Sequence, residues 1–155
     1  MKVTLVIVSV LLVLAIIGLF LLAQQSRVVP KLGLIEGNLM PCTIPSNCVS
    51  STETQSLGVA PIPFNGEAST AWIQMHQAIE AVGGMIEQKK ENYLWATFRS
   101  PLFGFVDDVE ILMDEEHQLF NIRSASRVGR SDFSVNRQRI EVLQQAFKNN
   151  QATKK

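Results

Sequence analysis

The residues best suited to chemistry lie between positions 123 and 137. The stretch RSASRVGRSDFSVNR holds four arginines, four serines and a single carboxylate, Asp132, in a chain whose formal net charge is zero. Guanidinium and hydroxyl donors near the free N–H groups of a helix start suit a phosphate, a lipid headgroup or a partner's carboxylate. The residues of this candidate anion- or partner-binding site are Arg123, Arg127, Arg130, Ser124, Ser126, Ser131 and Arg137.

A second interpretation pairs the arginines with acidic side chains of the same fold. A hairpin that closes around residues 115–118 places Glu110 directly opposite Arg123 on the polar face of the predicted sheet. The preceding hairpin brings Asp108 close to Arg99. The sequence therefore predicts an ion-pair network of Arg99, Asp108, Glu110 and Arg123, and internal pairing is the leading interpretation.

Catalytic and metal-binding patterns find little support. A serine or cysteine nucleophile in residues 48–51 with His76 or His117 lacks the G-x-S-x-G elbow. Two cysteines and two scattered histidines do not have zinc-site spacing. Asp107 and Asp108 are adjacent on a strand and point to opposite faces, which argues against a glycosidase pair. We predict no catalytic residue, no metal site and no cofactor.

The N-terminus carries an uncharged apolar run over residues 3–23. At about 1.5 Å per residue, this run is long enough to cross a hydrocarbon core of roughly 30 Å. A cleavable signal peptide is the alternative, but its apolar region is usually shorter and ends at a small-x-small site, of which Leu21 and Ala23 make a poor version. We predict a transmembrane anchor at residues 1–23.

Orientation rests on the cysteines, because Lys2 on one side and Arg27 with Lys31 on the other leave the positive-inside comparison nearly tied. Cys42 and Cys48 are close enough in a proline-bent segment to form a disulfide, and disulfides persist in oxidising compartments. We therefore predict a single-pass protein of the inner (cytoplasmic) membrane with a periplasmic C-terminal domain. Reduced thiols on the cytosolic side are the alternative.

Beyond the anchor, the pattern predicts one α+β domain. Residues 24–65 form a proline-rich arm with little regular structure, lying partly against the fold. In residues 66–148, a helix at 67–82 precedes three or four antiparallel strands, and a last helix follows Ser134 as N-cap. Residues 149–155 form a tail. The expected architecture is an N-terminal transmembrane helix, then an antiparallel sheet of three to four strands with two helices on one face.

Several stretches resemble an uncharacterised bacterial and plastid family, the domain of unknown function fourteen ninety-nine. They are PCTIPSNCVSS, YLWATFRS, FVDDVEILMDEE and RSASRVGRSDFSVNRQRIE, and the resemblance covers roughly residues 40–147. The resemblance implies no known activity. It marks as motif positions Cys42, Asn47, Cys48, Ser50, Ser51, Arg99, Asp107, Asp108, Glu110, Arg123, Ser124, Ser126, Arg127, Gly129, Ser131, Asp132, Asn136 and Arg137.

The leading functional hypothesis is a membrane-anchored extracytoplasmic domain that binds or assembles with an envelope partner. Its expected partners are the membrane and either a protein or an anionic lipid; balanced charge argues against nucleic acid. The alternative is an envelope enzyme acting on an anionic substrate, with the arginines as clamps and Asp108 or Glu110 as acid/base.

Overall fold

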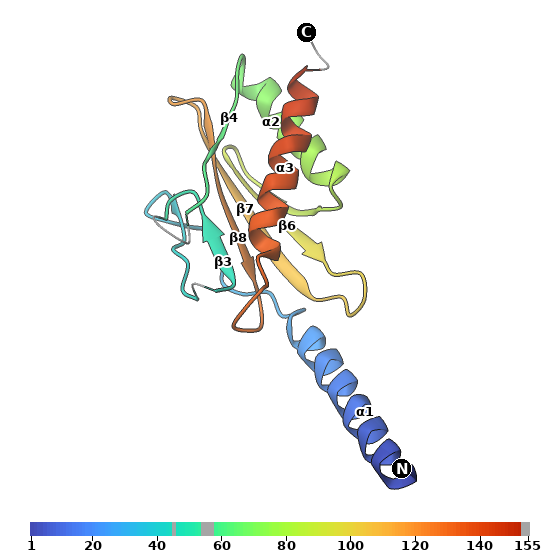
Figure 1. Ribbon diagram of the computed structural model, residues 1–155. Coiled ribbons are helices and arrows are strands. Elements are labelled where there is room, and N and C mark those ends of the chain that lie inside the picture. The colour runs from blue at the N-terminus through green and yellow to red at the C-terminus, as the bar shows by residue number, and fades with distance from the viewer. Residues whose placement is uncertain (45, 54–57, 153–155) are drawn as a thin grey trace.

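An apolar helix projects from a body built of one sheet and two helices (Figure 1). The computed structural model describes residues 1–44, 46–53 and 58–152. Helix α1, Lys2–Gln25, buries only Ala23 against the body. By length and composition α1 suffices to cross a membrane, and an N-terminal signal sequence would meet the same criteria. Pro45 of the predicted arm and residues 153–155 of the predicted tail lie outside the described residues.

The body is organised around a six-stranded antiparallel sheet. The strands run in the order β3-β8-β7-β6-β5, and β4 pairs with β8 beyond the end of β3. A separate hairpin joins β1 and β2. The bounds are β1 Leu34–Ile35, β2 Asn38–Leu39, β3 Cys48–Ser50, β4 Ile62–Pro63, β5 Met85–Lys89, β6 Tyr93–Arg99, β7 Val106–Asp114 and β8 Leu119–Ser126.

The predicted α+β class is confirmed, but the predicted count of three to four strands is wrong. The additional strands β3 and β4 come from the arm, which the prolines led us to expect as irregular. Val49, Ile62 and Phe64 are buried in the main core, so the arm contributes apolar surface that it must bury. Its pairing with β8 also satisfies an edge whose backbone groups would otherwise remain unpaired.

Strand alternation sorts the sheet into two unlike faces. Leu94, Val109 and Ile122 point toward the helices and are fully buried there. Helix α2, Ala68–Ala81, and helix α3, Val135–Ala152, cover this face, and Figure 1 shows α3 in front of the strands. The opposite face is polar, and the part of the arm that includes Gly33 and Leu39 lies against it.

Helix ends follow local chemistry. Gly84 lies three residues beyond the end of α2, and a Cβ there would lie 2.6 Å from the Ile79 side chain and 2.7 Å from Phe98. Ser134 lies directly before α3, as expected of its N-cap, and its carbonyl accepts the N–H of Gln138. The side chain that accepts backbone N–H groups is that of Asp132, which bonds Ser134 and Asn136 at 3.0 and 2.9 Å. A negative charge therefore already occupies the N-terminus of α3.

Candidate functional site

Asp108 is held by a bidentate contact with Arg127. Arg127 Nε and Nη2 donate to the two carboxylate oxygens at 2.8 and 2.7 Å, and Trp95 Nε1 donates to Asp108 Oδ1 at 2.8 Å. Arg99, the partner expected from the strand pattern, instead lies opposite Val106 and is exposed. The Arg127 guanidinium comes from the loop after β8 and lies 6.0 Å from the Trp95 ring centre.

The same arginine binds the end of the apolar helix. Arg127 Nη1 donates to the carbonyl oxygens of Ser26 and Arg27 at 3.2 and 3.4 Å. The buried Ser26 hydroxyl donates to the Ala23 carbonyl at 2.7 Å and accepts the N–H of Val106 at 3.0 Å. A cation near the last carbonyls of a helix is favourable. Arg127 thus joins α1 to β7 through one side chain.

Glu110 lies at the centre of the polar face and is completely buried. Arg123 Nη1 donates to its Oε2 at 2.8 Å, in the register that strand alternation predicts. The Tyr93 hydroxyl donates to Glu110 Oε1 at 2.7 Å, and the backbone N–H of Gly33 in the arm donates to the same oxygen at 3.0 Å. Burial and the bond to Glu110 raise the pKa of Tyr93, so this phenol remains protonated.

A third pair lies on the helix side of the sheet. Arg139 Nη2 donates to Asp107 at 2.5 Å, and Nη1 donates to Ser124 and Asn136 at 3.1 and 2.6 Å. The Arg139 guanidinium also lies 5.0 Å from the Phe98 ring centre. Arg139 was not among the predicted site residues; it follows Asn136 by three residues and therefore shares its face of α3. That spacing was the available signal.

These three contacts form one unit that we call the arginine–carboxylate seam. Its pairs are Arg123–Glu110, Arg127–Asp108 and Arg139–Asp107. Adjacent strand residues point to opposite faces, so Asp107 and Asp108 bind arginines on opposite sides of the sheet. Each pair has little exposure to solvent. The seam therefore fixes the loop after β8, helix α3 and the end of α1 onto a single strand, β7.

Two asparagines attach the disulfide loop to the segment after β8. Asn47 Nδ2 donates to the Gly129 carbonyl at 2.6 Å, and the Asn47 carbonyl accepts Asn136 Nδ2 at 3.0 Å. Asn136, which is fully buried, also bonds Ser124 and Ser126. These asparagines, which only the family resemblance had marked, connect two distant parts of the sequence.

The predicted disulfide is confirmed between Cys42 and Cys48. The Cys42 N–H donates to Glu53 at 3.0 Å, and Cys48 pairs with β8. The Ser46 hydroxyl donates to the Arg130 carbonyl, so the loop closed by the disulfide lies directly against the arginine-rich segment.

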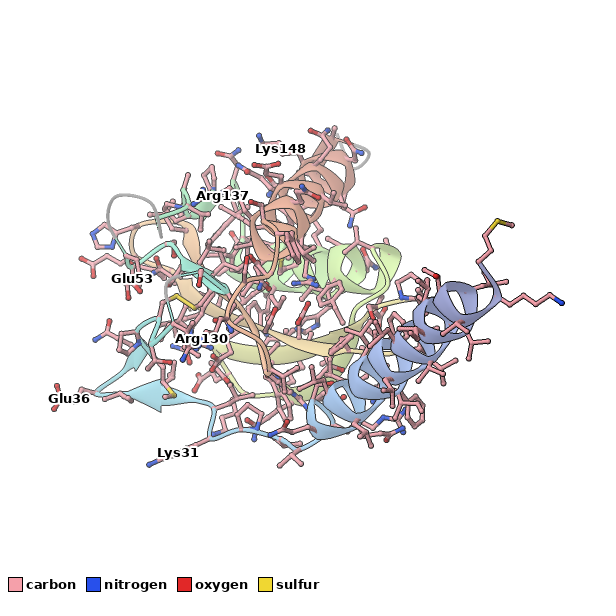
Figure 2. All side chains as sticks on the ribbon, turned by 60° about the horizontal axis from the view of Figure 1, so that its bottom comes forward. Lys31, Glu36, Glu53, Arg130, Arg137 and Lys148 are labelled. Atoms are coloured by element: carbon pink, nitrogen blue, oxygen red, sulfur yellow. A yellow bond between two sulfur atoms is a disulfide. The ribbon has the colours of Figure 1, made fainter. Side chains whose placement is uncertain are left out.

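The remaining predicted site residues lie nearer the surface. Arg130 and Ser131 are exposed, and Figure 2 labels Arg130 on the molecule. Arg137 Nη1 donates to the Gly58 carbonyl at 3.0 Å. The structure thus brings Arg123, Ser124, Ser126 and Arg127 into the interior and leaves residues 130–134 outside. We call residues 130–134 the exposed rim.

The exposed rim borders a small hollow of about 290 Å³. Phe133 on this rim is 88% exposed and has φ of 51°, and Ser134 follows with φ of 67°. Left-handed backbone is costly for a bulky residue, by roughly 1–2 kcal/mol. The Asp132 carboxylate, which caps α3, holds this conformation and presents the phenyl ring outward.

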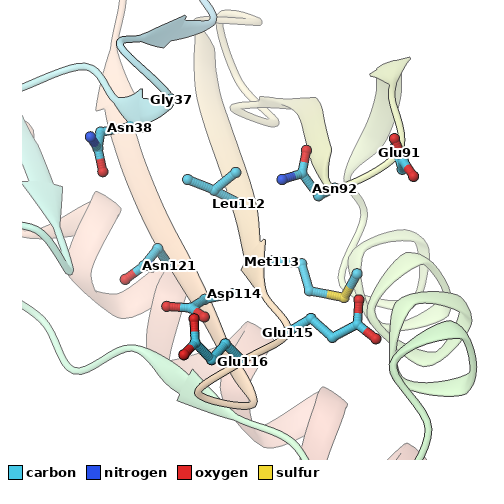
Figure 3. A pocket seen from close by; sticks show the side chains of 10 residues that line it. All are labelled: Gly37, Asn38, Glu91, Asn92, Leu112, Met113, Asp114, Glu115, Glu116 and Asn121. Carbon is cyan, nitrogen blue, oxygen red and sulfur yellow. The ribbon is translucent and has the colours of Figure 1, made fainter.

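A second hollow of about 520 Å³ lies at the other end of the polar face (Figure 3). Its polar side chains are acidic or amide-bearing, Leu112 and Met113 are its apolar side chains, and no arginine lines it among the described residues. No group of three metal-ligating side chains occurs in the described part of the chain. The polar lining residues are Asn38, Glu91, Asn92, Asp114, Glu115, Glu116 and Asn121.

The two histidines are shifted in opposite directions. His117, exposed in the β7–β8 turn, lies 2.9 Å from Asp114, and this contact raises the pKa of His117 above 6.5 and lowers that of Asp114. Burial beside Trp72 lowers the pKa of His76. Neither histidine contacts the seam, and neither belongs to a nucleophile–base pair among the described residues.

The molecule is thus an α+β domain with an N-terminal apolar helix, closed by a disulfide and an internal set of arginine–carboxylate pairs. Residues 38–147 match the model of a family described as a protein of unknown function, DUF1499. The match covers more than half of the chain, and the protein belongs to this family, as the sequence motifs predict. The comparisons with curated proteins and with solved structures find no match.

Proposed function

We propose that this protein is a membrane-anchored, extracytoplasmic binding module that holds an envelope partner protein at the bilayer surface. In this proposal α1 is the anchor, the arginine–carboxylate seam orients the domain on it, and the exposed rim with the disulfide loop is the recognition surface. The observation that carries the proposal is Phe133, an exposed aromatic held in a strained conformation. Backbone strain at a bulky surface residue is typical of functional sites.

The composition of the exposed rim supports partner recognition. Phe133 offers an aromatic anchor and Arg130 a guanidinium at the same loop, and these residue types dominate the energetics of protein interfaces. The Cys42–Cys48 disulfide and Asn47 fix the opposite wall of the hollow, so little ordering remains to oppose binding.

The enzyme alternative receives less support from the contacts. Asp108 and Glu110, its expected acid/base groups, each accept bonds from an arginine and from an aromatic side chain. The hollow lined by Glu91, Glu115 and Glu116 lies elsewhere and lacks arginine clamps among the described residues. An anion clamp and a reachable carboxylate therefore do not come together in one concave site.

A crosslinking experiment tests the recognition surface. A photoreactive phenylalanine analogue replaces Phe133 in one variant and Val142, an exposed residue on α3, in a matched control. We expect a discrete protein adduct at position 133 in intact membranes, reduced by Arg130→Ala, and none at position 142. Equal labelling at both positions, or no adduct at 133, would overturn the proposed surface.

The membrane orientation has its own test. Protease added to intact spheroplasts should digest the domain, and Cys42 and Cys48 should resist alkylation until the protein is reduced. The first outcome follows from the extracytoplasmic orientation, and the second from the formed disulfide in an oxidising compartment. A domain that is protected from protease and alkylated without reduction would place it in the cytosol.

A further inference from the structure

We propose that the β6–β7 loop, residues 100–105, inserts into the interface of the bilayer and makes a second membrane contact beside α1. The inference rests on the anchor role of α1 given above. The inference goes beyond the anchor role because it assigns lipid contact to the folded domain. It therefore also states which end of the domain faces the membrane.

The loop lies where the chain leaves α1. Arg99, the last residue of β6, pairs with Val106, the first residue of β7. Residues 100–105 therefore connect the two strands at this end of the sheet. Val106 donates its N–H to Ser26, the residue that ends α1. Figure 1 shows the loop at the end of the body from which α1 departs. A bilayer crossed by α1 therefore has its surface close to this loop.

The tip of the loop is apolar and ordered. Its sequence is SPLFGF, and the Leu102 side chain is 82% exposed. Ser100 N–H donates to the Phe105 carbonyl at 2.9 Å, and Gly104 N–H returns to the Ser100 carbonyl at 3.1 Å. The rings of Phe103 and Phe105 meet edge to face, 6.2 Å apart. An exposed leucine on a hydrogen-bonded turn loses little entropy when it enters an apolar phase.

Exposed basic side chains occur in the segment after α1 and at the end of β6. Arg27, Lys31 and Arg99 are exposed, and no ion pair engages them within the described residues. Figure 2 shows Lys31 extending away from the body. Basic residues next to a membrane span are attracted to anionic headgroups. The carboxylates nearest to this end, Asp107 and Asp108, are already neutralised by the seam.

The opposite turn provides an internal contrast. The β7–β8 turn lies at the far end of β7 and carries Glu115, Glu116 and His117, all exposed. The β6–β7 loop is therefore apolar with basic residues at the same end of the body, and the β7–β8 turn is acidic. This difference favours a bilayer at the α1 end and water at the other.

Depth-dependent fluorescence tests the contact in the full chain. The protein is reconstituted in vesicles of phosphatidylcholine and phosphatidylglycerol whose acyl chains carry bromine, a quencher of tryptophan. Leu102→Trp is compared with Ile73→Trp, which replaces a half-exposed residue on α2, and the wild-type chain gives the baseline from Trp72 and Trp95. We expect the added fluorescence to be quenched at position 102 and unaffected at position 73.

Each other outcome counts against a defined statement. Carbonate washing comes first: a chain released from the vesicles would refute the anchor and this inference together. If the chain is retained and Leu102→Trp is not quenched, the anchor stands and the loop contact is refuted. Equal quenching at positions 102 and 73 would mean that the domain has no fixed end toward the bilayer, which also overturns the inference.

Discussion

Arg127 and Arg130 lie three residues apart, yet they belong to two different regions of the molecule. Arg127 is buried between Asp108 and the carbonyls of Ser26 and Arg27 directly after α1, whereas Arg130 is exposed on the rim. The buried region consists of charges that the fold itself neutralises. The exposed region carries a phenylalanine and an arginine that nothing in the seam requires. Residue type alone does not distinguish a structural arginine from one available to a partner. The distance of the arginine from the end of β8 makes this distinction.

The largest effect is expected in the seam. Glu110→Gln leaves the guanidinium of Arg123 buried without its counter-charge, so we expect the free energy of unfolding to fall by about 3–5 kcal/mol. Urea denaturation of the full chain in detergent micelles measures it. Glu115→Gln, in an exposed turn, is the matched control and should change stability by less than about 0.5 kcal/mol. Equal effects in the two variants would contradict a distinction between buried and exposed charges.

The disulfide is expected to stabilise the fold less than the seam does. Replacing both Cys42 and Cys48 by serine releases a short loop and should lower the free energy of unfolding by about 2 kcal/mol. Because this loop forms one wall of the rim hollow, the adduct at position 133 should weaken as well. A double variant with wild-type stability would show that the bonds of Asn47 alone are enough to fix the loop.

On the exposed rim, a substitution is expected to leave the free energy of unfolding unchanged or to raise it. Phe133→Gly relieves the left-handed strain, and this gain offsets the entropy of the added glycine, so stability should equal that of the wild type or exceed it by up to about 1 kcal/mol. Partner capture should nevertheless be lost. A variant that is clearly destabilised would place Phe133 among the structural residues, contrary to its proposed role.

The smallest effect concerns the β7–β8 turn. The folded-state pKa of His117 is raised above 6.5 by Asp114, so this contact stabilises the protein below about pH 6.5 and is lost as the pH rises through the folded-state value. An NMR titration of His117 should give a midpoint above 6.5, and Asp114→Asn should lower it. Unchanged midpoints would show that the contact is absent in solution.

Much of the fold could be predicted from the sequence because strand alternation is a local property. The opposition of Glu110 and Arg123 follows from the period of two residues and a short turn, and so does the apolar face that contains Val109 and Ile122. The pairing of β3 and β4 with β8 could not be read in this way. The prolines of the arm argue against strands in a sequence-based prediction, and β8, the partner of β3 and β4, is distant in the sequence.

The site was harder to predict for a related reason. Arg127 lies beyond the end of β8, where alternation no longer determines direction, and its loop turns back to Asp108. Arg139 lies on a helix and reaches Asp107 across two elements. Neither contact has a local period, so the sequence indicated internal pairing of arginines in general but did not identify the partner of Arg127 and did not indicate a role for Arg139.

The most direct test of the account is a double-mutant cycle on Arg127 and Asp108. Arg127→Met, Asp108→Asn and the double variant are compared by urea denaturation of the full chain in micelles. Because the pair is bidentate and buried, we expect a coupling free energy of about 2 kcal/mol. Additive effects within about 0.5 kcal/mol would show that the two side chains do not interact, and would contradict the seam as the element that joins α1 to the sheet.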